Sequence, residues 1–173
     1  MQMKLRPLLI TVILCLVNTA YGQETSYHIS LFAESMDNGS AATAGISAGS
    51  DVFYGGLSWS YIESSKVIQR DNRKSIHPIF LFMGLRVPMK LSPYIEVGID
   101  LPEALIDNLL DNEEQSAAQA DYYLSGGLRY KINKRVSFSL YAKKYHFIFR
   151  ENIYAPTMKM RPRSYGFGMS ILF

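Results

Sequence analysis

The sequence predicts an all-β fold, an eight-stranded antiparallel up-and-down transmembrane β-barrel. Stretches in which large apolar side chains alternate with small or polar ones recur along most of the chain, and this period of two is typical of strands. Eight such stretches are present, each close to the roughly 9 to 11 residues that a tilted strand needs to cross a bilayer. The connections between them are sorted by length, as in membrane barrels with short turns at one end and long loops at the other.

The beginning of the chain has the features of a secretory signal peptide. A positively charged start is followed by an apolar run from Pro7 to Val17 and by the small-x-small pair Ala20 and Gly22. The apolar run is shorter than the about 20 residues that a spanning helix requires. We therefore expect residues 1–22 to be a signal peptide and residues 23–173 to form one outer-membrane barrel domain.

The composition of the expected mature chain excludes several classes of protein. The single cysteine of the sequence, Cys15, lies within the expected signal peptide, so the mature chain has none, and Leu14 precedes it where a lipoprotein site has a small residue. No disulfide framework is therefore expected. Of the 18 lysines and arginines, Lys4 and Arg6 are removed, which leaves 16 basic against 15 acidic residues and a net charge of +1. This balance gives no indication of a nucleic-acid partner.

Each of the eight predicted strands is identified by its alternation, and the second is the weakest of the set. In chain order they are "TSYHISLFAES" (25–35), "ATAGISAGS" (42–50), "VFYGGLSWSYI" (52–62), "PIFLFMGLRVP" (78–88), "SPYIEVGIDL" (92–101), "ADYYLSGGLRYKI" (120–132), "RVSFSLYAKKYHFIF" (135–149) and "RSYGFGMSILF" (163–173).

The connections alternate in length, and this decides which all-β architecture is predicted. The second, fourth and sixth are short ("SD", "MKLS" and "NK"), whereas the third, fifth and seventh are long; the first, "MDNGSA", is fairly short. With the amino terminus inside, all even connections lie on the periplasmic side together with both termini. A soluble β-sandwich has no reason to sort its loops in this way.

The two faces of the strands differ in polarity. We expect one face to contact lipid and to carry aromatic residues near the strand ends. The residues of this face are Phe53, Leu57, Trp59, Tyr61, Ile79, Leu81, Met83, Leu85, Val87, Ile95, Val97, Ile99, Tyr122, Leu124, Leu128, Tyr130, Val136, Phe138 and Leu140. The other face carries the charged and hydroxyl side chains. An eight-stranded barrel is just wide enough for its own side chains, so these charges should pair inside it. The predicted interior charge network is Glu34, Arg86, Glu96, Asp100, Asp121, Arg129, Lys131 and Lys143. Either the network closes the barrel as a salt-bridged plug, or it gates a narrow water path.

The last strand provides a resemblance to a known class. Large apolar or aromatic residues alternate with small ones up to the final Phe173, at Tyr165, Phe167, Met169 and Ile171. After a signal peptide, this pattern resembles the carboxy-terminal signature of bacterial outer-membrane β-barrel proteins. The strand number and loop parity resemble small barrels of the OmpA transmembrane domain, OmpX and OmpW type. The resemblance implies that the barrel-assembly machinery reads these five residues as an assembly signal, and that the last strand closes the barrel against the first.

The long loops are the expected working surface. These loops and their borders carry the cationic side chains Lys66, Arg70, Arg73, Lys74, Lys159, Arg161 and Arg163. They can contact lipopolysaccharide phosphates at the outer leaflet, or they can be ordinary solvated loop residues. In the 101–115 loop, Leu105, Ile106, Leu109 and Leu110 follow helical spacing, which indicates a lid or a helix at the membrane surface. The expected role is structural, envelope-interacting or weakly conducting, in a monomer that binds outer-membrane lipid and no nucleic acid.

An enzymatic alternative rests on His28 and Ser30, because lipid A deacylases and palmitoyltransferases also use small barrels. The His-x-Ser spacing resembles that of the deacylases and places both side chains on one face of a strand. That family carries its motif late in the chain and toward the outer leaflet, whereas these residues belong to the first strand. We therefore assign no catalytic, cofactor-binding or metal-binding residue from the sequence.

Overall fold

A computed structural model of the chain describes residues 25–64, 75–101, 121–149 and 158–173. Within these ranges the chain forms the following strands: β1 (Ser26–Met36), β2 (Gly39–Gly49), β3 (Phe53–Ser64), β4 (Ile79–Arg86), β5 (Leu91–Asp100), β6 (Tyr122–Lys131), β7 (Val136–Phe149), β8 (Met158–Met160) and β9 (Arg163–Leu172). Among the described residues, no helix is long and apolar enough to cross a membrane.

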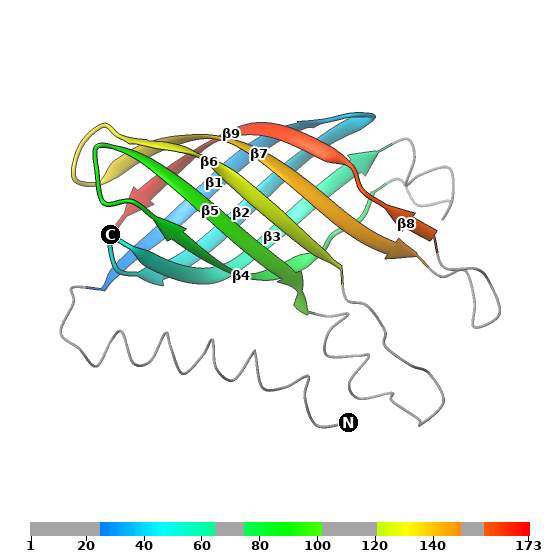
Figure 1. Cartoon of the computed structure of the whole chain (residues 1–173), viewed down its shortest axis with the longest axis horizontal. Coiled ribbons are helices and arrows are strands. Elements are labelled where there is room, and N and C mark those ends of the chain that lie inside the picture. Colours follow the sequence, from blue (N-terminus) through cyan, green and yellow to red (C-terminus); the bar gives the residue numbers. More distant parts are fainter. Residues whose placement is uncertain (1–24, 65–74, 102–120, 150–157) are drawn as a thin grey trace, which may run out of the picture.

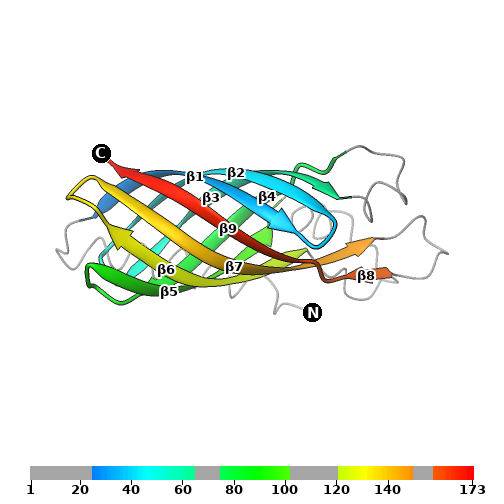
Figure 2. The same ribbon diagram turned by 90° about the horizontal axis from the view of Figure 1, so that it is seen from above.

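The strands close into an eight-stranded antiparallel barrel, which confirms the predicted fold class. Neighbours follow the order β6, β5, β4, β3, β2, β1, β9, β7, and the additional pairing of β6 with β7 completes the circle (Figures 1 and 2). The last strand, β9, pairs with β1 on one side and β7 on the other, for example Ile29 with Ile171. The short strand β8 pairs only with the end of β7 and lengthens the barrel wall there.

The two ends of the barrel are unlike. We call the end that carries the connections β2–β3, β4–β5 and β6–β7 the short-turn end; the carboxy terminus is also at this end (Figure 1). The opposite end, from which the chain continues to residues 65–74, 102–120 and 150–157, is the long-loop end. Those segments lie outside the described residues, and the predicted helix of the 101–115 loop lies almost wholly within one of them.

Two elements differ from the prediction. The second strand begins at Gly39 and not at residue 42, because Gly39 and Ser40 continue the ladder with Met36 and Ser35 of β1. The first connection is therefore a tight turn at Asp37 and Asn38, although it lies at the long-loop end. The strand β8 has no counterpart among the predicted strands.

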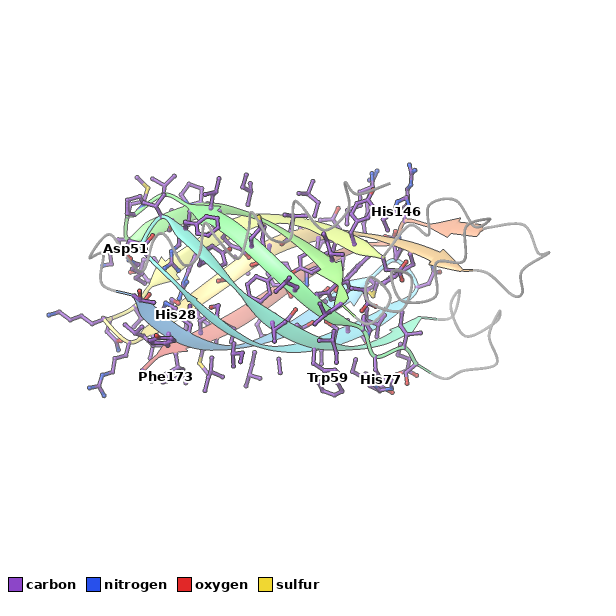
Figure 3. All side chains as sticks on the ribbon, turned by 90° about the horizontal axis from the view of Figure 1, so that it is seen from below. His28, Asp51, Trp59, His77, His146 and Phe173 are labelled. Atoms are coloured by element: carbon purple, nitrogen blue, oxygen red, sulfur yellow. The ribbon has the colours of Figure 1, made fainter. Side chains whose placement is uncertain are left out.

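The outer surface of the barrel is apolar, as predicted. Outward-facing side chains include Leu31, Ile95 and Leu140, which are 56%, 59% and 68% exposed. Aromatic residues lie near both ends: Trp59 lies toward the long-loop end and Phe173 at the short-turn end (Figure 3). Tyr122 is the first residue of β6 and therefore also lies at the long-loop end. Trp59 stacks on His77, and Tyr122 stacks on His146. An apolar wall bordered by aromatic rings is suited to contact with a bilayer.

Inside, two glycines provide the space for two large tyrosines. A Cβ atom at Gly84 would overlap the ring of Tyr54, and one at Gly98 would overlap the ring of Tyr123. Because β4 and β5 lack side chains at these positions, both rings can lie across the narrow interior. Their hydroxyl groups then reach the middle of the barrel.

Candidate functional site in the barrel interior

The interior is organised in layers, and the layer nearer the long-loop end is centred on Glu34. This carboxylate is buried and accepts hydrogen bonds from Lys143 Nζ, Tyr145 Oη and Ser164 Oγ, each at 2.8 Å. Thr43 Oγ1 donates a fourth, at 3.3 Å. The Lys143 ammonium also lies 4.6 Å from the ring centroid of Tyr123. Both charges of this ion pair are therefore compensated, as buried charges must be.

An aromatic lid lies at this end of the interior. We define it as Phe80, Tyr123, Tyr145, Phe147 and Ile62, all of which are at most 1% exposed. The ring centroids of Phe80 and Tyr123 are 4.9 Å apart, and those of Tyr145 and Phe147 are 5.1 Å apart. Met36 and Ala41 pack into the same cluster. The rings come from three strands, β4, β6 and β7, and Ile62 comes from β3, so the lid links opposite walls of the barrel.

The middle of the barrel contains Glu96, which is held by the two tyrosines that the glycines accommodate. Tyr123 Oη donates to Glu96 Oε1 at 2.7 Å, and Tyr54 Oη donates to Glu96 Oε2 at 3.1 Å. Beside them lies a small internal cavity of about 50 Å³. A space of this size holds a few waters and no larger solute.

Cations dominate the short-turn end. Arg86 is buried and donates through Nη2 to the Ser50 carbonyl at 2.7 Å and through Nε to the Asp51 carbonyl at 3.1 Å. Its guanidinium also lies over the Tyr54 ring, 5.1 Å from the centroid. The strand β4 ends at Arg86, so this side chain reaches the tight β2–β3 turn, whose carbonyls face it.

Arg129 and His28 form a second cationic group at this end. Arg129 donates through Nε to Ser137 Oγ at 2.7 Å and through Nη2 to His28 Nδ1 at 3.2 Å. Since Nδ1 accepts this bond, the proton of the neutral imidazole is on Nε2, which lies 3.2 Å from Ser26 Oγ. Ser26 in turn donates to the Gly49 carbonyl. This chain of bonds orients both the imidazole and the guanidinium.

A vestibule of about 1390 Å³ opens at the short-turn end, and its wall is strongly basic. Lys131 Nζ pairs with Asp51 Oδ1 at 3.1 Å, and this hydrogen bond holds the pKa of the Asp51 carboxyl below its usual range. Asp51 is the one acidic side chain among the described residues of the wall, against six cationic side chains: Arg86, Lys90, Arg129, Lys131, Lys134 and Arg135. Figure 3 shows His28 and Asp51 at the same end as Phe173.

The structure brings some of the predicted charge network together and separates other parts. All eight residues lie on the inward face, and Glu34 pairs with Lys143. Asp100 and Asp121 are buried neighbours at the long-loop end, where the Asp100 amide donates to the Asp121 carbonyl. Arg86 and Arg129, however, contact no carboxylate within ion-pair distance among the described residues; their partners are carbonyl, hydroxyl and imidazole groups. Glu96 is bound by the phenol hydroxyls of Tyr54 and Tyr123, which reach it across Gly84 and Gly98.

Sequence reasoning missed two contributors to the site. Asp51 belongs to the short "SD" turn and is absent from the predicted network, although it is the ion-pair partner of Lys131. Tyr54 and Tyr123 follow the inward-facing alternation of their strands but are not part of the predicted network. A signal was available, because inward-facing tyrosines with glycines on neighbouring strands predict side chains that cross a narrow barrel.

The remaining residues singled out from the sequence lie elsewhere in the barrel. Ser30 donates to Ser170 at 2.8 Å, and His28 bonds Ser26 and Arg129, so these two residues of the proposed catalytic spacing have other partners. Tyr165, Phe167, Ile171 and Phe173 face outward on and after β9, and Met169 is half-buried. Arg161 and Arg163 are exposed at the long-loop end, and Lys159 belongs to β8. Lys66, Arg70, Arg73 and Lys74 lie outside the described residues.

Comparison with known proteins identifies the fold. No family model and no curated protein matches the chain. Among solved structures, it is similar to Neisserial surface protein A, with a TM-score of 0.55 and 8% identity over 86% of this chain and 96% of that one. It is also similar to a chain from a study of de novo design of transmembrane β-barrels, with a TM-score of 0.51 and 10% identity over 86% and 95%. The chain therefore has the fold of a transmembrane β-barrel.

Proposed function

We propose that this protein is an integral outer-membrane β-barrel of a Gram-negative bacterium with a structural or envelope-interaction role. In this proposal the short-turn end faces the periplasm and the long loops face outward. The apolar outer wall, its aromatic borders and the likeness to transmembrane barrels support insertion into a membrane. The signal peptide expected at residues 1–22 supports export to the periplasm.

The observation that favours a closed barrel over a channel is the aromatic lid. Its five side chains are almost completely buried, and the Glu34–Lys143 pair lies directly beneath them. Below this level the internal cavity is only about 50 Å³, whereas a conducting pore needs a continuous water path. The interior therefore favours a barrel that separates its two ends.

A planar-bilayer recording tests this proposal. We expect the purified protein to insert and to give no stepwise conductance, while removal of the lid aromatics should produce measurable steps. Stepwise conductance from the unaltered protein would contradict the closed-barrel proposal. Insertion is checked separately by co-flotation with vesicles, so that an absent current is not confused with an absent protein.

We further propose that exposed cations at the long-loop end contact the phosphates of lipopolysaccharide. Arg161 and Arg163 support this, because both are exposed beside the outward end of β9. A guanidinium forms paired charge-assisted hydrogen bonds with phosphate. Binding of purified lipopolysaccharide should weaken in an Arg161→Gln, Arg163→Gln variant and remain unchanged in Arg135→Gln, whose side chain is exposed at the opposite end.

A further inference from the structure

Two arginines form the floor of the vestibule, which is the boundary between the vestibule and the interior of the barrel. Arg86 and Arg129 are the two residues that line both the vestibule and the small internal cavity, so their guanidinium groups separate these spaces. Arg86 is only 5% exposed. A buried cation is normally paired with an anion, because leaving it unpaired in a poorly solvated space is costly. Among the described residues, neither arginine has a carboxylate within ion-pair distance.

Both guanidiniums retain unused hydrogen-bond donors. Arg86 uses Nε and Nη2 toward the turn carbonyls, and Arg129 uses Nε and Nη2 toward Ser137 and His28. A guanidinium has five N–H donors, so several on each side chain, including both on Nη1, have no partner among the described residues. Because both arginines line the vestibule and the internal cavity, these donors lie at the boundary between the two spaces.

The fixed orientation of the two side chains makes this arrangement suitable for a ligand. The turn carbonyls and the Tyr54 ring hold Arg86 from one side, and Ser137 and His28 hold Arg129 from the other. The surrounding wall adds four further cationic side chains, and its one acidic side chain among the described residues, Asp51, is already paired with Lys131. Such a field concentrates anions at the floor of a concave space.

We propose that Arg86 and Arg129 form a binding site for a small oxyanion of the phosphate class, at the floor of the short-turn vestibule. The free donors of the two guanidiniums bind the oxygens of one anion between them, since forked N–H groups match phosphate geometry. The vestibule is wide enough to admit the ion from the short-turn end. The aromatic lid closes the other end, so the site is a pocket with a single entrance and not a stage of a transmembrane path.

Calorimetric titration of the purified barrel in detergent tests the proposal directly. Inorganic phosphate is titrated at constant ionic strength, with chloride as the matched salt. We expect one saturable phosphate site, with affinity lowered about tenfold or more by either Arg86→Gln or Arg129→Gln, the loss expected for charge-assisted hydrogen bonds. Lys144→Gln removes the same charge from an exposed position on β7 and should leave the affinity unchanged.

Three results would overturn the site. These are heats that are the same with phosphate and chloride, wild-type affinity in the Arg86→Gln, Arg129→Gln double variant, or an equal loss of affinity in Lys144→Gln. Folding of each variant is checked by its heat-modifiable migration in gels.

A second measurement needs no variant. Phenylglyoxal modifies accessible arginines, and the modified positions are mapped by mass spectrometry in the unaltered protein. Phosphate should slow the modification of Arg86 and Arg129 and should not slow that of Arg163, which is exposed at the opposite end. Equal slowing at all three positions, or at none, contradicts the proposal.

Discussion

Replacing Lys143 by Met should destabilise the barrel strongly, because it leaves the buried Glu34 carboxylate without its cation. The Glu34 and Lys143 side chains are 0% and 6% exposed, and their N–O distance is 2.8 Å. Breaking a buried pair by removing one partner typically costs about 3 to 5 kcal/mol. Tyr145, Ser164 and Thr43 still donate to Glu34 after the change, so we expect a loss of about 3 kcal/mol, near the lower limit of that range.

The matched control is the pair of Lys131 with Asp51. Its N–O distance is similar, 3.1 Å, but its side chains are 37% and 68% exposed. Exposed pairs contribute about 0 to 1 kcal/mol, so Lys131→Met should have a small effect. The free energy of unfolding is measured by urea titration in lipid vesicles for Lys143→Met, Lys131→Met and Glu34→Gln, and for the double variant that combines Glu34→Gln with Lys143→Met. The double variant should be less destabilised than the sum of its single changes. A loss below about 1 kcal/mol in Lys143→Met, equal to that of the exposed pair, would mean that water already solvates Glu34 and would refute the reasoning.

Three further predictions concern the glycines, the lid and the short-turn ion pair. Gly84→Ala should lower the free energy of unfolding by about 1 to 3 kcal/mol because its Cβ overlaps the Tyr54 ring, whereas Gly126→Ala, where a Cβ meets no atom closer than 3.6 Å, should be nearly neutral in the same urea titration. Phe80→Ala should lower it by about 3 to 5 kcal/mol and give conductance steps in a planar bilayer, and a silent, stable variant would show that the lid does not close the interior. The lowered pKa of Asp51 means that its pairing with Lys131 stabilises the fold above the ordinary carboxylate range and that this contribution is lost as the pH falls through the folded-state pKa. Asp51→Asn should therefore reduce the pH dependence of the unfolding midpoint below pH 5 slightly, and an increased dependence would contradict the assignment.

The fold could be predicted from the sequence because a membrane barrel repeats one simple pattern. Each strand must present apolar side chains to lipid and polar ones to the interior, so the period of two is strong in β5 and β6, and the strand ends there were predicted to within two residues. The start of β2 was missed because Gly39, Ser40 and Ala41 are small and carry little alternation. Their pairing with β1 is set by the register of the neighbouring strand, which the local sequence does not contain.

The interior could be predicted only in part. Alternation correctly places Arg86, Arg129 and Glu96 on the inward face, but it says nothing about their height along the barrel or about which groups they meet there. Height depends on the stagger between strands, which brings Arg86 to the β2–β3 turn and Glu96 to two tyrosines on other strands. A count of charges on one face therefore overestimates the number of ion pairs.

The positions of the unpaired arginines follow from the different solvation of the two ends. Near the aromatic lid, water is excluded, and Lys143 is paired with Glu34 at 2.8 Å. At the short-turn end, the open vestibule admits mobile anions, so Arg86 and Arg129 can remain charged without a carboxylate of the barrel. If the vestibule is what makes these charges tolerable, a carboxylate placed among them should stabilise the barrel and compete with phosphate. Ser137→Asp introduces one beside Arg129, whose Nε lies 2.7 Å from Ser137 Oγ. Raised stability together with weakened phosphate binding would connect the charge pattern of the wall with the proposed anion site, whereas unchanged phosphate binding would contradict that connection.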